Sequence, residues 1–116
     1  MSDNLRPLCR LEELPDGSAK GFEGPPGSFI GLLAVRQGDE VHVYQNSCPH
    51  IGTPLDWTPD RFLSADGRYL VCATHGAEFR ISDGMCLRGP CKGDSLERVL
   101  IRINEGVIYV VENSAG

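Results

Sequence analysis

Two short motifs that combine cysteine and histidine are the part of this sequence best suited to chemistry. They are Cys48-x-His50 and Cys72-x2-His75, and residues 51–71 lie between them. Each motif closely follows an apolar run that is typical of a β-strand, so we expect each one in a loop at a strand end. If the two loops face each other, their two thiols and two imidazoles form a Cys2His2 metal site.

Two kinds of metal centre use this set of ligands. A structural zinc ion binds two cysteines and two histidines in a tetrahedron, whereas a [2Fe-2S] cluster binds two cysteines at one iron and two histidines at the other. Zinc sites of this composition usually place like ligands together, often with the histidines on a helix. Here each loop carries one ligand of each kind, so the spacing favours the cluster and leaves zinc, or an empty site, as the alternative.

The residues around the two motifs favour the same interpretation. Gly52 and Gly76 follow the two histidines and let the backbone approach closely, so that N–H groups can point at sulfur. Pro49 and Pro54 stiffen the first loop, which lowers the reorganisation that accompanies the arrival of an electron.

The rest of the chain is typical of β structure. Short apolar or alternating runs are separated by Gly, Asp, Asn and Pro, which predicts an antiparallel β-sandwich or barrel and no helix. Strands are expected at 8–14, 28–35, 41–44, 61–64, 69–72, 78–81, 98–103 and 107–112. Turns at 36–40, 65–68 and 104–106 predict hairpins, whereas 17–27 and 89–95 are expected to have the least regular structure.

Composition and charge limit the possible partners and compartment. At 116 residues the chain is long enough for one domain with a modest core. A net charge of −5 argues against a nucleic-acid partner and leaves room for a basic protein surface. No signal peptide and no membrane-spanning stretch is expected, which indicates the cytoplasm. Five cysteines in that compartment indicate metal binding rather than a disulfide framework.

The sequence resembles the Rieske-type [2Fe-2S] ferredoxin family, in its soluble, low-potential bacterial form. The resemblance lies in "CPH.G" at 48–52, "CATHGAEF" at 72–79, "SDG" at 82–84 and Gly89-Pro90, which in that family belongs to a third loop over the cluster. It extends from Leu8 onward. One departure is the longer separation between the two motifs, with the extra residues in 56–68.

This resemblance implies a fold and a ligand set. The fold is a single Rieske domain over 1–116, an antiparallel β-sandwich with a small cluster-binding subdomain at about 46–92. Cys48 and Cys72 are the implied ligands of the inner iron, and His50 and His75 are those of the outer iron. Two neutral imidazoles in place of thiolates raise the potential above that of plant-type ferredoxins.

Four positions indicate a low potential within the family. The respiratory type resembles "CTHLGC…CPCHGS.Y", whereas this chain has Thr53 and Thr74 in place of the additional cysteines and Ala77 and Phe79 in place of Ser and Tyr. The loop disulfide and two hydrogen bonds to sulfur are therefore not expected. We expect a potential of roughly −150 mV.

The implied function is that of a soluble electron carrier, not an enzyme. Such a protein passes single electrons between a reductase and an acceptor enzyme such as an oxygenase. The chain is too short to contain the mononuclear iron domain of a terminal oxygenase. Alternatives are a small Rieske subunit docked on a larger, nitrite-reductase-like reductase, a cluster-based redox sensor and, more remotely, a structural zinc-binding module.

The remaining candidate residues are given structural roles. His42 is expected on the surface, and Cys9 as a buried structural thiol. Cys86 and Cys91 are expected to be packed free thiols, with an occasional disulfide or additional metal ligation as alternatives. Trp57 and Phe79 are expected to pack beside the cluster. Four acidic residues form a solvated face, or dock a basic partner: Asp56, Asp60, Asp66 and Glu78.

Overall fold

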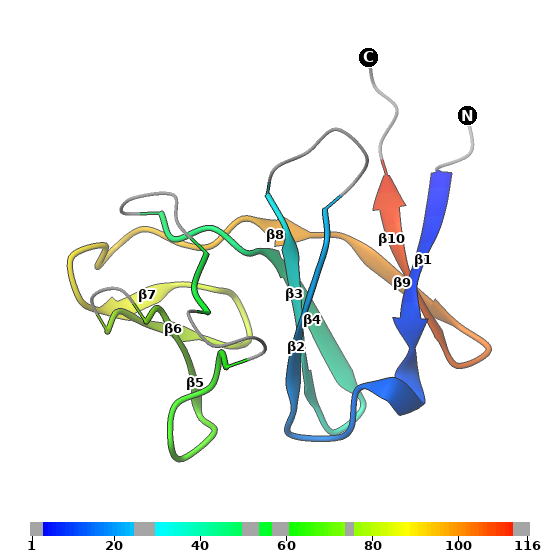
Figure 1. The fold of residues 1–116 in the computed structure, drawn as a ribbon, viewed down its shortest axis with the longest axis horizontal. Coiled ribbons are helices and arrows are strands. Elements are labelled where there is room, and N and C mark those ends of the chain that lie inside the picture. The colour runs from blue at the N-terminus through cyan, green and yellow to red at the C-terminus, as the bar shows by residue number, and fades with distance from the viewer. Residues whose placement is uncertain (1–3, 25–29, 50–53, 57–60, 74–75, 113–116) are drawn as a thin grey trace.

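The structure is a computed structural model that describes residues 4–24, 30–49, 54–56, 61–73 and 76–112 (Figure 1). Within these ranges it contains short strands and one 3-10 helix. In chain order they are β1 (Asn4–Arg10), η1 (Leu11–Glu13), β2 (Ala19–Phe22), β3 (Leu32–Gln37), β4 (Glu40–Gln45), β5 (Tyr69–Val71), β6 (Glu78–Arg80), β7 (Cys86–Arg88), β8 (Arg98–Val99), β9 (Ile101–Asn104) and β10 (Val107–Glu112).

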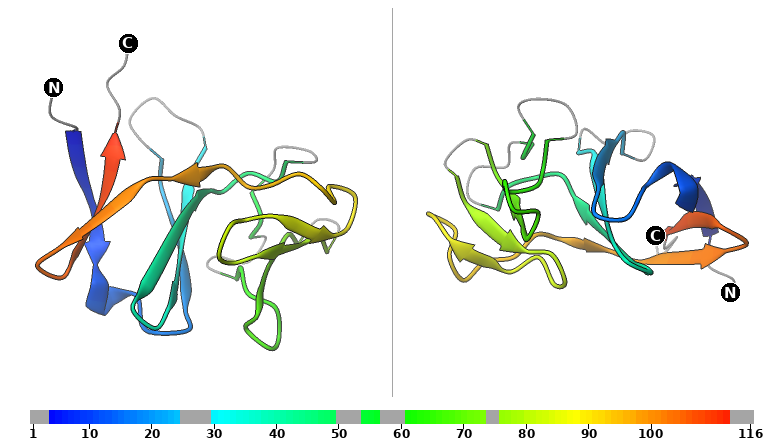
Figure 2. Two further views of the ribbon diagram at one scale, coloured as in Figure 1. Left: turned by 180° about the vertical axis from the view of Figure 1, so that it is seen from behind. Right: turned by 90° about the horizontal axis from the view of Figure 1, so that it is seen from below.

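The strands form three antiparallel sheets that lie side by side. A terminal sheet has the order β1-β10-β9, a middle sheet has the order β2-β3-β4-β8, and a third sheet has the order β5-β6-β7. Figures 1 and 2 show the middle sheet between the other two. Only Leu100 separates β8 from β9, so this segment (orange) passes directly from the middle sheet to the terminal sheet. The structure therefore confirms the predicted all-β, antiparallel fold.

The middle sheet is buried on both faces, because each neighbouring sheet covers one of them. Along β3 the side chains alternate, with Leu32 in the cluster on the terminal-sheet side and Leu33 in the cluster on the third-sheet side. Along β4, Val43 and Tyr44 divide between the two clusters in the same way. This period of two is what a strand requires. The molecule therefore has two hydrophobic cores, one on each face of the middle sheet.

A buried tyrosine joins the middle sheet to the turn after β6. Tyr44 has no exposed surface, and its hydroxyl donates a hydrogen bond to the carbonyl of Ile81. The turn passes close to the ring, since a Cβ at Gly84 would lie 2.8 Å from Cε1 of Tyr44, and Gly84 also has a φ of +74°. Burial raises the pKa of Tyr44 to about 12, because the charged phenolate is poorly solvated there.

The hairpin predicted from strands at 28–35 and 41–44 is present as β3 and β4, and the one predicted from 98–103 and 107–112 is present as β9 and β10. Several local predictions are wrong. Ala19–Phe22 is a strand paired with β3, although 17–27 was expected to be irregular. The strand expected at 8–14 lies at Asn4–Arg10 instead, and Leu11–Glu13 forms a 3-10 helix. β7 was not expected. In the described part of the chain, no helix has the length and apolarity that crossing a membrane requires.

Candidate metal centre

The first cysteine lies in a loop whose two ends are fastened together by one side chain. Cys48 follows β4 and is 3% exposed. The amide nitrogen of Asn46 donates to Asp56 Oδ1 at 2.9 Å, and Asn46 Oδ1 accepts from the backbone N–H of Leu55 at 2.8 Å. The backbone N–H of Asn46 donates to the carbonyl of Gly31 at 2.8 Å, which fixes this end of the loop on the middle sheet. Sequence reasoning missed Asn46, because a single asparagine before a turn carries no distinctive signal.

The second cysteine lies at the start of a loop that closes on itself. Cys72 follows β5 and is 1% exposed. Its N–H donates to the carbonyl of Ala77 and its carbonyl accepts from the N–H of Gly76, both at 2.9 Å. The N–H of Ala73 donates to the carbonyl of Leu55 at 2.9 Å. This last bond joins the second loop directly to the first.

The structure therefore brings the two predicted cysteine loops together. Cys48 and Cys72 belong to the same buried cluster between the middle and third sheets. His50 and His75 lie outside the described residues, so the structure does not test their part of the predicted ligand set. The described residues contain no group of three or more His, Cys, Asp and Glu side chains arranged to bind a metal ion.

Two buried cysteine side chains suit the inner iron of a [2Fe-2S] centre. Burial in apolar surroundings disfavours an isolated thiolate, whereas coordination to a metal ion deprotonates a thiol outright. An iron ion at this position would therefore supply the positive charge that makes two buried thiolates stable. The donor chemistry of Cys48 and Cys72 fits the inner half of such a cluster.

The Gly-Pro loop packs directly on the second cysteine loop. A Cβ at Gly89 would lie 2.8 Å from Cα of Ala77 and 3.0 Å from its Cβ, and the φ of Gly89 is +104°. Only glycine fits such an approach without displacing the backbone. Ala77 and Phe79 are fully buried here, as the predicted packing role of Phe79 requires, whereas Trp57 lies outside the described residues.

Two further cysteines extend the group of buried sulfur atoms. Cys86 and Cys91 are each 2% exposed and are free thiols, as predicted. The Cys91 thiol donates to Sγ of Cys86, with the sulfur atoms 2.8 Å apart, and the Cys86 thiol donates to the carbonyl of Arg88 at 3.2 Å. Burial, followed by contact with Cys86 and Cys48, raises the pKa of the Cys91 thiol to about 12.

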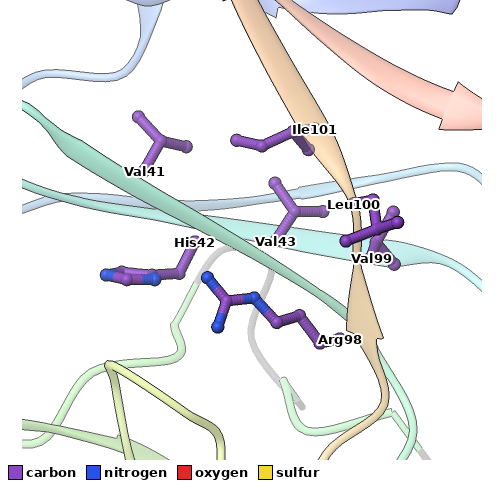
Figure 3. A pocket seen from close by; sticks show the side chains of 7 residues that line it. All are labelled: Val41, His42, Val43, Arg98, Val99, Leu100 and Ile101. Carbon is purple, nitrogen blue, oxygen red and sulfur yellow. The ribbon is translucent and has the colours of Figure 1, made fainter.

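Cys9 and His42 lie apart from these sulfur atoms. Cys9 is half-buried against the core on the terminal-sheet side, and burial raises its pKa. The prediction of a surface histidine is wrong, because β4 is covered on both faces and leaves His42 only 7% exposed. Its Nε2 lies 3.5 Å from Oε1 of Glu40. His42 lines a cavity of about 280 Å³ along β4 and β8, together with Arg98 and five aliphatic residues (Figure 3).

The described acidic candidates are engaged with groups of the chain itself. Asp66 accepts from the Ser64 hydroxyl at 2.7 Å and from the backbone N–H of Arg68 at 3.1 Å. The hydrogen bond from Ser64 is the main reason why the pKa of Asp66 is lowered. Glu78 lies 3.6 Å from Nε of Arg88. Asp60 lies outside the described residues.

Comparison with known proteins identifies the family. The family model of the Rieske [2Fe-2S] domain matches residues 4–104. The chain therefore belongs to the Rieske [2Fe-2S] domain family, whose cofactor is a [2Fe-2S] cluster. A search of curated proteins found no match.

Solved structures share the fold at low sequence identity. The ferredoxin of carbazole 1,9a-dioxygenase from Nocardioides aromaticivorans IC177 has a TM-score of 0.75 and 22% identity, over 95% of this chain and 99% of that chain. The Sphingomonas yanoikuyae B1 ferredoxin has a TM-score of 0.71 and 22% identity, over 94% and 99%. A chain from a complex of reduced oxygenase and oxidized ferredoxin in carbazole 1,9a-dioxygenase has a TM-score of 0.75 and 23% identity, over 97% of each.

Proposed function

We propose that this protein is a Rieske-type electron carrier that binds one [2Fe-2S] cluster through Cys48, His50, Cys72 and His75. The observation that carries the proposal is the pair of buried cysteines, Cys48 and Cys72, on two loops that are hydrogen-bonded to each other. The cluster, when bound, accepts and releases one electron. The cluster-binding subdomain spans about 46–92.

The residues of the chain prepare the site for such a cluster. The bonds of Asn46 hold the ends of the first loop, and the bond from Ala73 to Leu55 holds the second loop beside it. A site that is already assembled needs little reorganisation when its charge changes. Burial of the two cysteines keeps water away from the thiolates.

The acceptor that we propose is an enzyme such as an oxygenase, with a reductase as the electron donor. One solved structure with this fold is the ferredoxin of carbazole 1,9a-dioxygenase, and another matching chain comes from a complex of oxygenase and ferredoxin in that system. The net charge of −5 suits docking on a basic surface. We propose that the chain catalyses no reaction alone and acts in the cytoplasm.

Spectroscopy of the freshly purified protein tests the cluster. We expect two irons and two sulfides per chain, visible absorption, and a Rieske-type EPR signal that appears only after reduction with dithionite. Cys72→Ser is expected to abolish the signal. Cys9→Ser is the matched control, because Cys9 is a partly buried thiol on the far core, and it is expected to keep the signal. A colourless protein that contains zinc and no sulfide after anaerobic purification would overturn the proposal.

A second measurement tests the role as a carrier. The reduced holoprotein is mixed with an oxygenase component and the absorbance is followed by stopped flow. We expect single-electron reoxidation that slows as ionic strength rises, because charge steers the encounter. A rate that no acceptor raises above the slow reaction with oxygen would contradict the role as a carrier.

A further inference from the structure

A cavity lies at the point where the edge strand of the middle sheet separates from its neighbour. The pairing of β4 with β8 ends at Val43 and Val99, and the chain then passes through Leu100 into β9 of the terminal sheet. The space beside the separating strands is a cavity of about 280 Å³. Leu100 lines it and is 68% exposed, so the cavity is accessible from solvent on this side.

The wall of the cavity is aliphatic except for two side chains that carry nitrogen. The aliphatic residues are Val41, Val43, Val99, Leu100 and Ile101. The other two are His42 and Arg98, and Figure 3 shows the guanidinium of Arg98 turned toward the imidazole of His42. Among the described residues, no carboxylate lines this cavity. The polar part of its wall therefore consists of nitrogen atoms.

The imidazole of His42 is buried without a hydrogen-bond partner. His42 is 7% exposed, and within the described part of the chain neither Nδ1 nor Nε2 has a partner. The carboxylate of Glu40 lies 3.5 Å from Nε2, beyond the usual hydrogen-bond range of about 2.7–3.2 Å, and its side chain is 75% exposed. Buried polar groups are nearly always paired. An unpaired imidazole in the wall of a cavity therefore indicates a partner inside that cavity.

Arg98 narrows the chemistry of that partner. Its side chain makes no hydrogen bond or ion pair with any residue that the structure describes. A planar guanidinium binds a carboxylate through two parallel hydrogen bonds, which the charges strengthen. Water also accepts a hydrogen bond from an imidazole, but it does not neutralise the guanidinium, and the aliphatic wall gives it few partners. A carboxylate with a short apolar body satisfies both parts of the wall.

We propose that this cavity binds a small aliphatic carboxylate, whose oxygen atoms accept hydrogen bonds from Arg98 and His42. The apolar part of the ligand contacts the aliphatic wall, as in most sites for small molecules. The volume restricts the ligand to a few carbon atoms, since drug-sized ligands use cavities of about 300–1,000 Å³. None of the four proposed cluster ligands lines the cavity, so the site adds a function to electron transfer.

Calorimetric titration of the holoprotein with isovalerate tests the site. We expect saturable binding with a Kd of about 1 mM and a rise in Tm, because a ligand of the folded state stabilises it. Isovaleramide has the same shape without the charge and is expected to bind about tenfold more weakly. Acetate lacks the branched apolar part and is also expected to bind more weakly.

Substitution of Arg98 tests the contact with the carboxylate. Arg98→Gln is expected to weaken binding of isovalerate by about tenfold, because the paired, charge-assisted hydrogen bonds are lost. Arg88→Gln is the matched control, because Arg88 is an exposed arginine of β7 that does not line the cavity. Both variants remove one positive charge, so the comparison distinguishes a direct contact from an effect of net charge.

Two further variants test the role of His42. His42→Phe keeps an aromatic ring and removes both nitrogen atoms, so we expect several-fold weaker binding. Its Tm without ligand is expected not to fall, because no hydrogen bond within the described part of the chain is lost. Glu40→Gln is expected to bind isovalerate more tightly, because it removes a negative charge beside the imidazole.

Three results would overturn the site. They are the absence of saturable binding up to about 50 mM isovalerate, equal affinity for isovalerate and isovaleramide, and an unchanged affinity in Arg98→Gln. Any of them would mean that the cavity holds water only. None of them affects the proposed function, because the Rieske-type EPR signal is measured on the same samples without a carboxylate.

Discussion

At the scale of single residues, the close packing of Gly89 on Ala77 leaves no room for a side chain beside the second cysteine loop. A side chain at Gly89 meets two obstacles, an unfavourable φ of +104° and backbone atoms at 2.8 Å. Gly93 has nearly the same φ, +97°, but open space around its Cβ position. Comparing the same substitution at Gly89 and at Gly93 therefore distinguishes the cost of backbone strain from the cost of steric overlap.

We expect Gly93→Ala to lower the free energy of unfolding by about 1–3 kcal/mol through strain alone. Gly89→Ala is expected to cost at least about 1 kcal/mol more and to lower cluster occupancy, because the Gly-Pro loop is displaced from Ala77. Urea denaturation and iron analysis of both variants give the comparison. Equal costs and equal occupancy in the two variants would show that the contact with Ala77 is unimportant.

The buried hydroxyl of Tyr44 makes the free energy of unfolding depend on pH under alkaline conditions. Its pKa is raised to about 12 in the folded protein, against an ordinary value of 10.0. The unfolded chain therefore loses this proton first. The stabilising contribution is complete below pH 10 and is lost as the pH rises from 10 to about 12.

We expect Tyr44→Phe to cost about 1 kcal/mol at pH 7, because the hydrogen bond to the Ile81 carbonyl is lost. The variant is also expected to lose less stability between pH 10 and 12 than the parent. Tm measured across this range provides the test. Parallel curves for parent and variant would mean that another group causes the alkaline loss.

At the scale of the elements, the first cysteine loop depends on one asparagine side chain. Asn46 makes two hydrogen bonds across the loop, to Asp56 and to the N–H of Leu55. These bonds hold Leu55 beside the end of β4, and the carbonyl of Leu55 in turn accepts from the N–H of Ala73 in the second cysteine loop.

We expect Asn46→Ala to cost about 1–3 kcal/mol and to accelerate cluster loss to a chelator several-fold. Ser64→Ala is the matched control, because Ser64 also bonds a carboxylate and a backbone N–H, but at the turn before β5. The control is expected to keep the parent rate of cluster loss. The rate of cluster loss is measured from the decrease in visible absorbance. An unchanged rate in Asn46→Ala would contradict the role of this side chain.

The sequence predicts strands better than it predicts their environment. The hairpins were predictable because turn residues such as Gly106 separate clear apolar runs. β2 was not, because Lys20 and Gly21 lack a strand pattern and pair through the backbone with β3. The burial of His42 was not predictable either. A period of two in the sequence assigns side chains to the two faces of a strand, but it does not show that both faces are covered.

The candidate site was also predictable only in part from the sequence. Cys48 and Cys72 were identified by type and spacing, and the structure places both in one buried cluster. The hydrogen bond from the N–H of Ala73 to the carbonyl of Leu55 was not predictable, because it depends on how the two cysteine loops fold against each other. Such contacts between distant segments require the tertiary structure.

At the scale of the whole molecule, the two cores on either side of the middle sheet differ in their dependence on the cluster. Only the core on the third-sheet side contains Cys48 and Cys72. The core on the terminal-sheet side is aliphatic and includes Ile108 and Val110 of β10. Removal of the cluster should therefore loosen one side of the molecule first, since proteins open in local cooperative units.

We expect the apoprotein, prepared with a chelator and a reductant, to exchange amide hydrogens much faster in β5, β6 and β7 than the holoprotein does. Strands β1, β9 and β10 are expected to keep their protection. Hydrogen exchange followed by mass spectrometry measures both regions in one experiment. An equal loss of protection everywhere would mean that the molecule unfolds as one unit.

Because both faces of β3 and β4 are covered, these two strands also limit which substitutions the sequence can accept. Leu33 and Val43 face different cores, and all residues at 32–35 and 41–44 are buried. Neither strand therefore has a solvent-facing side there on which a substitution would be neutral. In a library that replaces every position in turn, 32–35 and 41–44 should therefore tolerate the fewest substitutions. Strands with exposed positions, such as β9, should tolerate more substitutions.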